Sequence, residues 1–318
     1  MPTKEVAAAG TTSVELTPSQ QRTLDGLIEA GARPALPADL VPGLRSRIEE
    51  TVRRHPLPEP LWLGKSSLND LGRCPGLFDA VRAGERAPFA FSARFAAGRL
   101  AHKAVELEVA GREDRDPHEL VEEASLRLVE DDAFRTYWES LEPIRRDENL
   151  MDAAKTLELF RSTLPPLRLM RRQLAPSTEW HVRVELEGGA LVLSGTLDLV
   201  LGVSTPGEPV RASRLAIDVK TGRAWPEHAE DMRFYALLLA LRFGVPPYRV
   251  ATLYLDSGEW QAEDVDARVL DRAADRVIEA VSAAAGSQAG RRIALRPGPY
   301  CTWCPRAHTC PVSQAASG

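Results

Sequence analysis

Three of the four cysteines in this chain lie close together near its carboxyl end. They follow the pattern Cys301-x2-Cys304-x5-Cys310, while Cys74 lies far away near the other end. Thiolates grouped in this way usually hold a metal ion or an iron–sulfur cluster. If all four bind one group, they join two distant segments and stabilise the fold as a long-range cross-link does. The spacing alone is compatible with a tetrahedral zinc ion, a cluster or free structural thiols.

Two acidic residues and a lysine lie between the cysteine segments, inside apolar runs of sequence. Asp218 and Lys220 are two residues apart, so on a strand their side chains point to the same face. Asp198 follows Gly195-Thr196-Leu197 in the preceding apolar run. If the two strands pair, Asp198 and Asp218 can bind one hard cation such as Mg²⁺ or Mn²⁺, with the carbonyl of Val219 as a third oxygen.

This donor set suits the hydrolysis of a phosphodiester. A bound divalent ion polarises the phosphodiester and lowers the pKa of an attacking water, and Lys220 would orient that water or neutralise the transition state. An isolated Asp-x-Lys is more often a surface salt bridge. Here the charges lie inside apolar strands, where an unpaired charge is costly, which favours a functional site.

Length and composition describe a globular protein. The 318 residues can bury a large core, as one domain with an elaboration or as two closely packed domains. The amino terminus has no apolar stretch, and the longest apolar run, Ala236 to Leu241, is too short to cross a bilayer. We therefore expect a soluble cytoplasmic protein with no membrane partner, in which clustered thiols favour a metal over disulfides.

The net charge of −5 excludes a global positive field that would attract nucleic acid. Any polyanion has to meet a local patch. Candidate arginine clusters are Arg45/Arg47/Arg53/Arg54, Arg168/Arg171/Arg172 and Arg291/Arg292/Arg296. Each can pair with phosphates, although each is also compatible with an ordinary solvated helix face.

The periodicity of apolar residues predicts a helical first part and a mixed second part. Predicted helices cover about 39–54, 89–109, 117–129, 147–174 (interrupted by Pro165-Pro166), 226–243 and 266–285, and another helix is expected after a cap at Ser66 or Ser67. Prolines 56, 58 and 60 predict an extended connector. Alternation predicts a hairpin around Gly188-Gly189 and strands at 214–220 and 249–255, with a further strand near Trp260.

This order of elements predicts an α/β or α+β fold with a central mixed sheet flanked by helices. We expect a disordered segment over 1–20, a helical region with a proline-rich connector over 21–65, a single large domain over 66–311 and a loose tail over 312–318. Within the large domain, residues from about 112 to 174 form a helical insertion.

Four ordered motifs resemble the PD-(D/E)XK nucleases, and within them the RecB-like branch that carries an iron–sulfur cluster (AddB nuclease modules, CRISPR-adaptation nucleases and exonuclease V-like enzymes). The motifs are Gly98-Arg-Leu-Ala-His102, Gly195-Thr-Leu-Asp198, Asp218-Val-Lys220-Thr-Gly222 and a helix with Tyr235. One cysteine precedes the histidine and three follow the last helix, as in that branch. The resemblance covers about Ser66 to Pro311.

The resemblance implies a restriction-endonuclease-like core and a metal-dependent deoxyribonuclease that acts on single-stranded DNA or DNA ends. It implies that His102, Asp198 and Asp218 bind Mg²⁺ or Mn²⁺ and that Lys220 is the catalytic lysine. It also implies a structural [4Fe-4S] cluster on the four cysteines. Because the chain has no Gly-x4-Gly-Lys-Ser/Thr motif, we expect a helicase or another repair or defence subunit as a partner for unwinding.

Several residues keep alternative interpretations. His102 by itself would be an ordinary core or surface histidine, and Glu179 either supports the site or is an exposed strand carboxylate. The family's Gln-x-x-x-Tyr reads Asp231-x-x-x-Tyr235 here, and we count both residues as candidate catalytic groups, although Tyr235 also suits the core. Close to the cysteines, residues Arg296, Trp303 and Arg306 can shield a cluster, contact DNA or simply pack.

Two other functions remain open from the sequence. A DNA-end-binding subunit with weak cleavage is favoured by Asp231, whose acceptor-only carboxylate replaces an amide and can repel phosphate. The third possibility is a small interaction protein that a zinc ion stabilises, in which the Asp-x-Lys pattern has no catalytic role.

Overall fold

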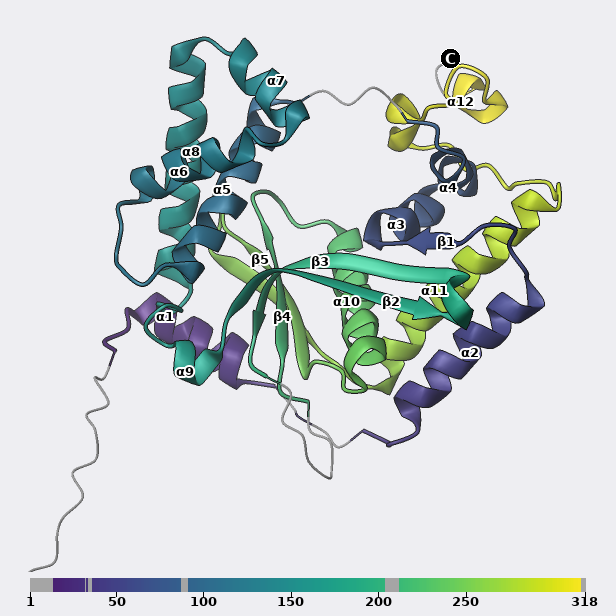
Figure 1. The fold of residues 1–318 in the computed structure, drawn as a ribbon, viewed down its shortest axis with the longest axis horizontal. Helices are drawn as coiled ribbons and strands as arrows, with labels where there is room; N and C mark the ends of the chain where they lie inside the picture. Colours follow the sequence, from purple (N-terminus) through teal and green to yellow (C-terminus); the bar gives the residue numbers. More distant parts are fainter. Residues whose placement is uncertain (1–13, 32, 34–35, 87–90, 204–211, 316–318) are drawn as a thin grey trace, which may run out of the picture.

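A six-stranded mixed sheet forms the centre of the protein (Figure 1). The computed structural model describes residues 14–31, 33, 36–86, 91–203 and 212–315. The strand order is β1-β3-β4-β5-β6, and β2 also pairs with β3. This confirms the predicted mixed sheet flanked by helices. The strands are β1 (Leu61–Leu63), β2 (Ser177–Leu186), β3 (Leu191–Leu201), β4 (Leu215–Lys220), β5 (Arg249–Tyr254) and β6 (Glu259–Asp264).

Strand β3 has three partners, and their arrangement creates a fork. β2 pairs antiparallel with β3 from Leu191 to Val200, which occupies one edge of β3. The other edge is shared: β1 runs parallel to residues 191–193, and β4 runs antiparallel to residues 199–201. Residues 194–198 therefore lie between the two ladders on that edge. On that edge, the backbone groups of residues 194–198 are available for contacts other than strand pairing.

Helices cover both faces of the sheet and extend beyond it. They are α1 (Pro18–Thr23), a π-helical turn (Leu24–Glu29), α2 (Leu40–Arg54), α3 (Lys65–Arg73), α4 (Pro75–Arg82), α5 (Ala93–Ala110), α6 (Pro117–Leu128), α7 (Asp132–Ser140), α8 (Pro143–Thr163), α9 (Arg171–Leu174), α10 (Pro226–Phe243), α11 (Ala267–Gln288) and α12 (Pro311–Ala315). Figure 1 shows the α5 to α8 group on one side of the site region and α3, α4 and α12 on the other. In the described parts of the chain, no helix combines the length and apolarity needed to cross a membrane.

Alternating side chains divide the interior into two cores. On β4, Ile217 and Val219 belong to the core shared with α5, α6 and α8. Ala216 belongs to the other core, which α2, α10 and α11 build against the sheet. Asp218 and Lys220 follow the phase of Ala216, as the sequence predicts. They therefore lie on the α10 side of the strand.

Helix α10 is the most deeply buried helix around the site. It begins with Pro226 at its first position, where a missing backbone N–H costs nothing, and Gly244 ends it at a left-handed φ of 74°. Its residues from Phe234 to Leu241 are all buried. It packs against β2, β3 and β5 as well as α11. This burial fixes the positions of Asp231 and Tyr235 relative to β3.

The helix expected after Ser66 or Ser67 is in fact two helices. α3 starts after Gly64, and the extended Cys74 ends it and precedes α4. Pro75 explains the break, because proline supplies no N–H to continue α3 and disfavours a helical conformation at Cys74. The prediction of a serine cap was therefore wrong. The break places the Cys74 side chain at the junction of two helices.

Other differences from the predicted elements are local. The predicted connector before residue 65 contains β1, which is too short to show alternation. Helix α7 was not predicted, although Asp131 caps it through the backbone N–H groups of Ala133 and Phe134.

The start predicted at Phe89 lies outside the described residues, and α5 begins at Ala93. Helix α1 falls partly within the segment predicted to be disordered, because the amide of Gln20 donates to the carbonyl of Arg161 on α8. Likewise, α12 lies mostly in the predicted tail.

We predict that Gly195→Ala destabilises the protein and disturbs the site. A Cβ at Gly195 would lie 2.7 Å from Cε1 of Tyr235, which is buried and cannot retreat. The expected loss in the free energy of unfolding is about 1–3 kcal/mol, measured by urea denaturation. The control is Gly43→Ala on α2, where a Cβ meets nothing within 4 Å and helix propensity favours alanine. Equal stability of the two variants would contradict this packing argument.

Candidate active site

The fork of β3 brings three carboxylates together. Continuing the β3–β4 register by one residue places Asp198 opposite Asp218. The β2–β3 register places Asp198 opposite Glu179 on its other side, where the ladder skips one pair. Residues opposite each other on paired strands point to the same face. Glu179, Asp198 and Asp218 therefore converge on one place.

Asp198 has a mixed environment. Its Oδ2 accepts a hydrogen bond from the backbone N–H of Val219 at 2.7 Å, which ties β3 to β4 just beyond their ladder. Its Oδ1 lies 3.7 Å from Nδ1 of His102. Burial and the charge of Asp218 raise the pKa of Asp198, against the opposing effect of His102 and Lys220. A cation bound here would relieve that repulsion.

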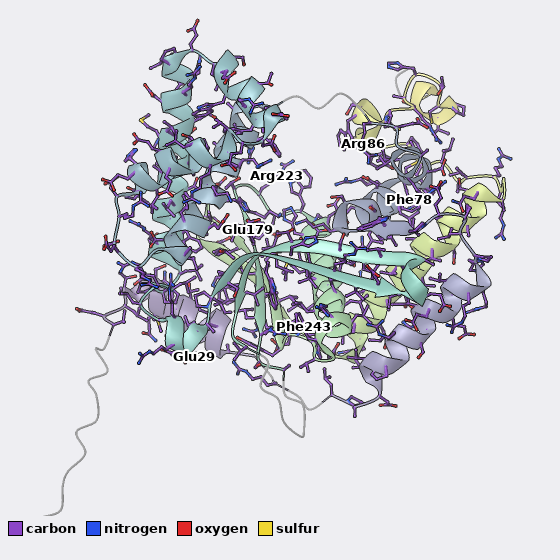
Figure 2. All side chains as sticks on the ribbon, in the orientation of Figure 1. Glu29, Phe78, Arg86, Glu179, Arg223 and Phe243 are labelled. Atoms are coloured by element: carbon purple, nitrogen blue, oxygen red, sulfur yellow. The ribbon has the colours of Figure 1, made fainter. Side chains whose placement is uncertain are left out.

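Glu179 has a backbone conformation that is rare for its residue type. Its φ of 47° lies in the left-handed region near the start of β2, and non-glycine residues in that region carry a backbone cost. Desolvation and the charge of Asp198 raise the pKa of its carboxyl group. Figure 2 labels Glu179 where β2 passes the α5 to α8 group. Strain at this position is consistent with a functional role for the side chain.

One group of residues within the described chain has the spacing of metal ligands. His102, Glu179 and Asp198 each offer a donor atom, and these atoms lie within 4.8 Å of one another. An octahedral ion with bonds of about 2.1 Å separates its ligand atoms by about 3–4 Å, so the donors need only a small shift to bind one ion. The two carboxylates suit Mg²⁺ or Mn²⁺, and the imidazole adds a nitrogen donor of the kind that transition ions bind. Glu179, which the sequence left ambiguous, is part of this group.

Helix α5 supplies His102 and one wall of the site. Ser92 caps the helix by accepting from the N–H of Phe95. Gly98 allows α5 to pass close to the loop after β4, since a Cβ there would lie 3.2 Å from Oγ1 of Thr221. A cavity of about 580 Å³ opens beside the metal-ligand group, between α5 and the strands, and Arg94 and Arg99 also line it.

Asp218 lies between two lysines. Its Oδ2 is 2.6 Å from Nζ of Lys220, and its Oδ1 accepts from Nζ of Lys65 at 3.1 Å. Burial would raise the pKa of this carboxyl, which is 1% exposed, but the two ammonium groups outweigh burial and hold the pKa below its usual range. For Lys65, burial lowers the pKa, and the charges of Asp218 and its neighbours more than reverse this. Lys65 therefore stays charged.

Sequence reasoning did not find Lys65. It is the first residue of α3, 153 positions before Asp218, and the sequence around it, Leu63-Gly-Lys-Ser-Ser, carries no pattern that indicates a site. The short β1 brings it there, because β1 pairs with β3 immediately before α3 begins. A long-range strand pairing of three residues left no local signal to detect.

Tyr235 and Asp231 lie behind the carboxylates. The hydroxyl of Tyr235 donates to the carbonyl of Thr196 at 2.6 Å, inside the β3 fork. Asp231 accepts from the amide of Asn69 at 2.7 Å and is only 6% exposed. Burial raises the pKa of Asp231, and the nearby charge of Lys65 opposes that shift. In this structure, both residues hold α10, α3 and β3 together.

The four cysteines line one cavity of about 380 Å³ beside the start of α4, where Gly76 and Leu77 also line it. The backbone N–H of Arg296 donates to Sγ of Cys74 at 3.4 Å, and the Arg296 guanidinium donates to the carbonyls of Leu71 and Gly72 at the end of α3. Cys301, Cys304 and Cys310 come from the segment after α11. Cys74 and the three cysteines of the 301–310 segment therefore border the same cavity.

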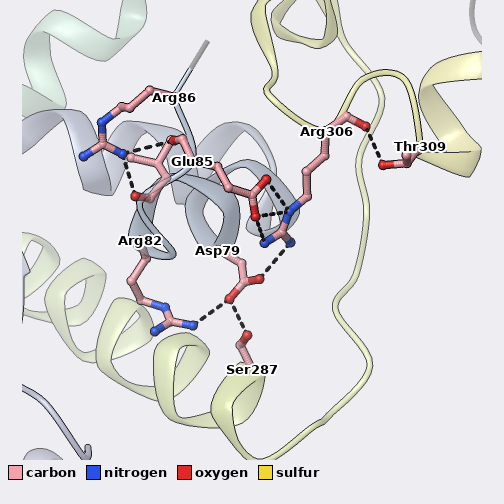
Figure 3. A network of polar contacts seen from close by, with 8 residues as sticks. Asp79, Arg82, Glu85, Arg86, Ser287, Arg306 and Thr309 are labelled. Atoms are coloured by element: carbon pink, nitrogen blue, oxygen red, sulfur yellow. Dashed lines mark hydrogen bonds and ion pairs between the residues drawn. The ribbon is translucent and has the colours of Figure 1, made fainter.

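Arg306 ties the cysteine segment to α4. Its guanidinium contacts Glu85 at 2.6 Å and Asp79 at 2.9 Å, and Asp79 also accepts from Arg82 and Ser287 (Figure 3). These hydrogen bonds hold the pKa of Arg306 above its usual range and, against burial, the pKa of Asp79 below it. Arg306 thus packs against α4, while Trp303 is half exposed.

Comparison with known proteins gives a family. The model of the PD-(D/E)XK nuclease superfamily matches residues 63–311, which is most of the chain. The chain therefore belongs to the PD-(D/E)XK nuclease superfamily. No curated protein matches it. Among solved structures, it is similar to the one titled "Crystal structure of SSO0001", with 14% identity and a TM-score of 0.33 over 85% of this chain and 94% of that chain.

We predict that Glu179→Gln weakens Mn²⁺ binding by about 10- to 100-fold, because the amide leaves one fewer anionic ligand. The measurement is titration calorimetry with Mn²⁺ at constant pH. The matched control is Glu106→Gln, since Glu106 lines the same cavity but pairs with Lys103. If the two variants bind Mn²⁺ equally well, Glu179 is not a ligand.

Proposed function

We propose that this protein is a metal-dependent deoxyribonuclease of the RecB-like branch, acting on single-stranded DNA or DNA ends. The observation that carries the proposal is the group of His102, Glu179 and Asp198 beside the Asp218–Lys220 ion pair. The superfamily consists generally of nucleases, and the geometry supplies the metal ligands and the lysine that phosphodiester hydrolysis needs. An exonuclease acting at strand ends is the activity we favour.

The ion supplies charge stabilisation for the phosphate and lowers the pKa of the attacking water. The chain's own residues supply orientation and counter-charge. Lys220 lies at the end of β4, with its side chain 25% exposed, so its ammonium can reach a substrate phosphate or the water. Arg94 and Arg99 line the cavity and can pair with neighbouring phosphates.

Asp218 and the carbonyl of Val219 remain predicted metal ligands. Both carboxylate oxygens of Asp218 contact ammonium groups, so Asp218 would have to exchange one of these contacts for the ion. Lys65 makes this exchange possible, because its ammonium stays beside Asp218 and compensates the carboxylate charge when Lys220 turns to the substrate. We propose that Lys65 positions Asp218 in this way.

We propose that the four cysteines hold a structural [4Fe-4S] cluster. A [4Fe-4S] cluster is larger than a single zinc ion, and the cavity of about 380 Å³ that the cysteines line has room for it. The resemblance to cluster-bearing nucleases also favours iron. Arg306 and Arg296 hold the two cysteine segments in place through protein contacts, which suits a structural role.

The structure does not favour the function of a poorly cleaving DNA-end-binding subunit. That function was suggested by the negative charge of Asp231, but the carboxylate is buried and bonded to Asn69. It is therefore shielded from a phosphate in the cavity. A helicase or another repair or defence subunit remains a proposed partner, because the nuclease site itself offers no means of unwinding DNA.

We predict that Lys220→Met reduces cleavage of end-labelled single-stranded DNA by at least about 100-fold, because the transition-state charge loses its ammonium partner. The assay uses anaerobically purified protein with Mn²⁺ or Mg²⁺, and chelation of the ion should abolish cleavage. Lys155→Met is the control, since Lys155 is exposed on α8 and pairs with the exposed Asp152. Equal cleavage by all three proteins would refute the assignment.

We predict about four iron atoms per chain after anaerobic purification, with the broad visible absorption of a cluster. Cys304→Ser should lose most of this absorption and iron, because a thiolate ligand is removed. The control is Thr302→Ala, an exposed neighbour in the same segment. Stoichiometric zinc without iron would decide for the zinc alternative.

A further inference from the structure

A second cavity adjoins the candidate active site on the side of Lys220. It measures about 600 Å³, and Lys220, Arg223 and Trp225 are among its lining residues. Arg94 and Thr221 line this cavity and also the first one. The two cavities therefore meet at these residues. A polymer lying in one can continue into the other past Lys220.

Trp225 presents a large aromatic surface in this cavity. It is 49% exposed, although burying a tryptophan ring is strongly favourable. The guanidinium of Arg223 lies 4.1 Å from the centre of its ring, so a cation covers part of the indole. Trp225 precedes α10 without making a side-chain capping hydrogen bond. Helix geometry therefore does not require a tryptophan at this position.

The surroundings of Trp225 are basic although the whole chain is acidic. Arg94, Lys220 and Arg223 line the cavity, against the single carboxylate of Asp256. Arg94 extends from α5 across Gly222 and donates to the carbonyl of Thr221 at 3.3 Å. A Cβ at Gly222 would lie 2.8 Å from Nη2 of Arg94, so glycine makes this path available. Figure 2 shows Arg223 on the loop between the α5 to α8 group and α3.

We propose that Trp225 is a stacking platform for an unpaired base of single-stranded DNA, next to the phosphate that is cleaved. Arg223 and Arg94 would bind the phosphates on either side of that nucleotide. The physical reason is that arginine and an exposed indole together match the alternation of phosphate and base along a strand. Because bases inside a duplex are already stacked on both faces, such a platform accepts only an unpaired base.

This inference rests on the proposed nuclease function and narrows its substrate to strands with unpaired bases. It selects single strands by stacking and not by sequence, since every base has an aromatic face. It also separates two roles at neighbouring residues: Lys220 acts at the scissile phosphate, whereas Trp225 holds the adjacent nucleotide. Loss of Trp225 should therefore affect binding of the strand more than binding of the metal.

The test measures fluorescence anisotropy of a labelled twelve-nucleotide oligo(dT) and of a blunt hairpin duplex, with Ca²⁺ in place of the catalytic ion. Trp225→Ala should weaken single-strand binding by about 5- to 150-fold and leave duplex binding unchanged. Trp225→Phe should restore most of the affinity, because phenylalanine retains a stacking face. Mn²⁺ binding by calorimetry should remain as in the wild type for both variants.

The matched control is Trp62→Ala. Trp62 is 52% exposed on the edge strand β1, with Arg183 4.5 Å from its ring centre, so it has the same chemistry away from the cavity. It should leave single-strand binding unchanged. Unchanged binding by Trp225→Ala, an equal loss for single strand and duplex, or an equal loss in Trp62→Ala would each overturn the platform.

The outcome also separates the platform from the nuclease activity. If DNA is cleaved in a Lys220-dependent way and Trp225→Ala binds normally, the platform is wrong and the enzyme assignment stands. If Trp225 is needed for single-strand binding but no cleavage occurs with Mn²⁺ or Mg²⁺, the platform stands and the enzyme assignment is wrong. Tighter binding of oligo(U) than of oligo(dT) would overturn DNA as the ligand.

Discussion

The repulsion among three carboxylates at the fork of β3 is the constraint on which the rest of the site depends. Glu179, Asp198 and Asp218 converge because β2 and β4 both pair with β3 near Asp198. Carboxylates held this close together cannot all ionise unless cations compensate them. Two lysines compensate Asp218, and the remaining pair is arranged with His102 as a set of metal ligands.

The two sides of this constraint explain the opposite pKa shifts. Despite burial, the pKa of Asp218 is held low by Lys65 and Lys220. The pKa values of Asp198 and Glu179 are raised by desolvation and by neighbouring negative charge. If a metal ion compensates Asp198 and Glu179, its binding is coupled to their deprotonation, because the ligands must release protons to the solvent.

Around the carboxylates, the scaffold is held by polar contacts that reach across the sequence. The Tyr235 hydroxyl donates to a backbone carbonyl inside the fork. Asn69 donates to Asp231 of α10 and accepts from Arg276 of α11, which links the two helices. At the cysteine end, Arg306 joins the last segment to α4 (Figure 3). Helices α3 and α4 thus connect Lys65 at the site with the cysteine cavity. Displacement of either helix would change the geometry of both places.

Much of the fold and part of the site followed from the sequence alone. The alternation around Asp198 and Asp218-Val219-Lys220, the apolar α10 and the cysteine spacing are local patterns, because period and neighbouring residues decide them. The mixed sheet and the side-chain phase of Asp218 and Lys220 could be predicted for that reason. Pro75 likewise makes the path of the chain uncertain at Cys74 from the sequence alone, whereas the start of α3 after Gly64 could not be predicted.

Only the tertiary structure decided which residues complete the site. Lys65 reaches Asp218 through a three-residue strand pairing, Glu179 faces Asp198 through a strained position in β2, and Arg94 crosses Gly222 to join two cavities. Each of these depends on segments that are distant in sequence and adjacent in space. Such contacts depend on how all the elements pack together, and a local sequence pattern therefore does not predict them.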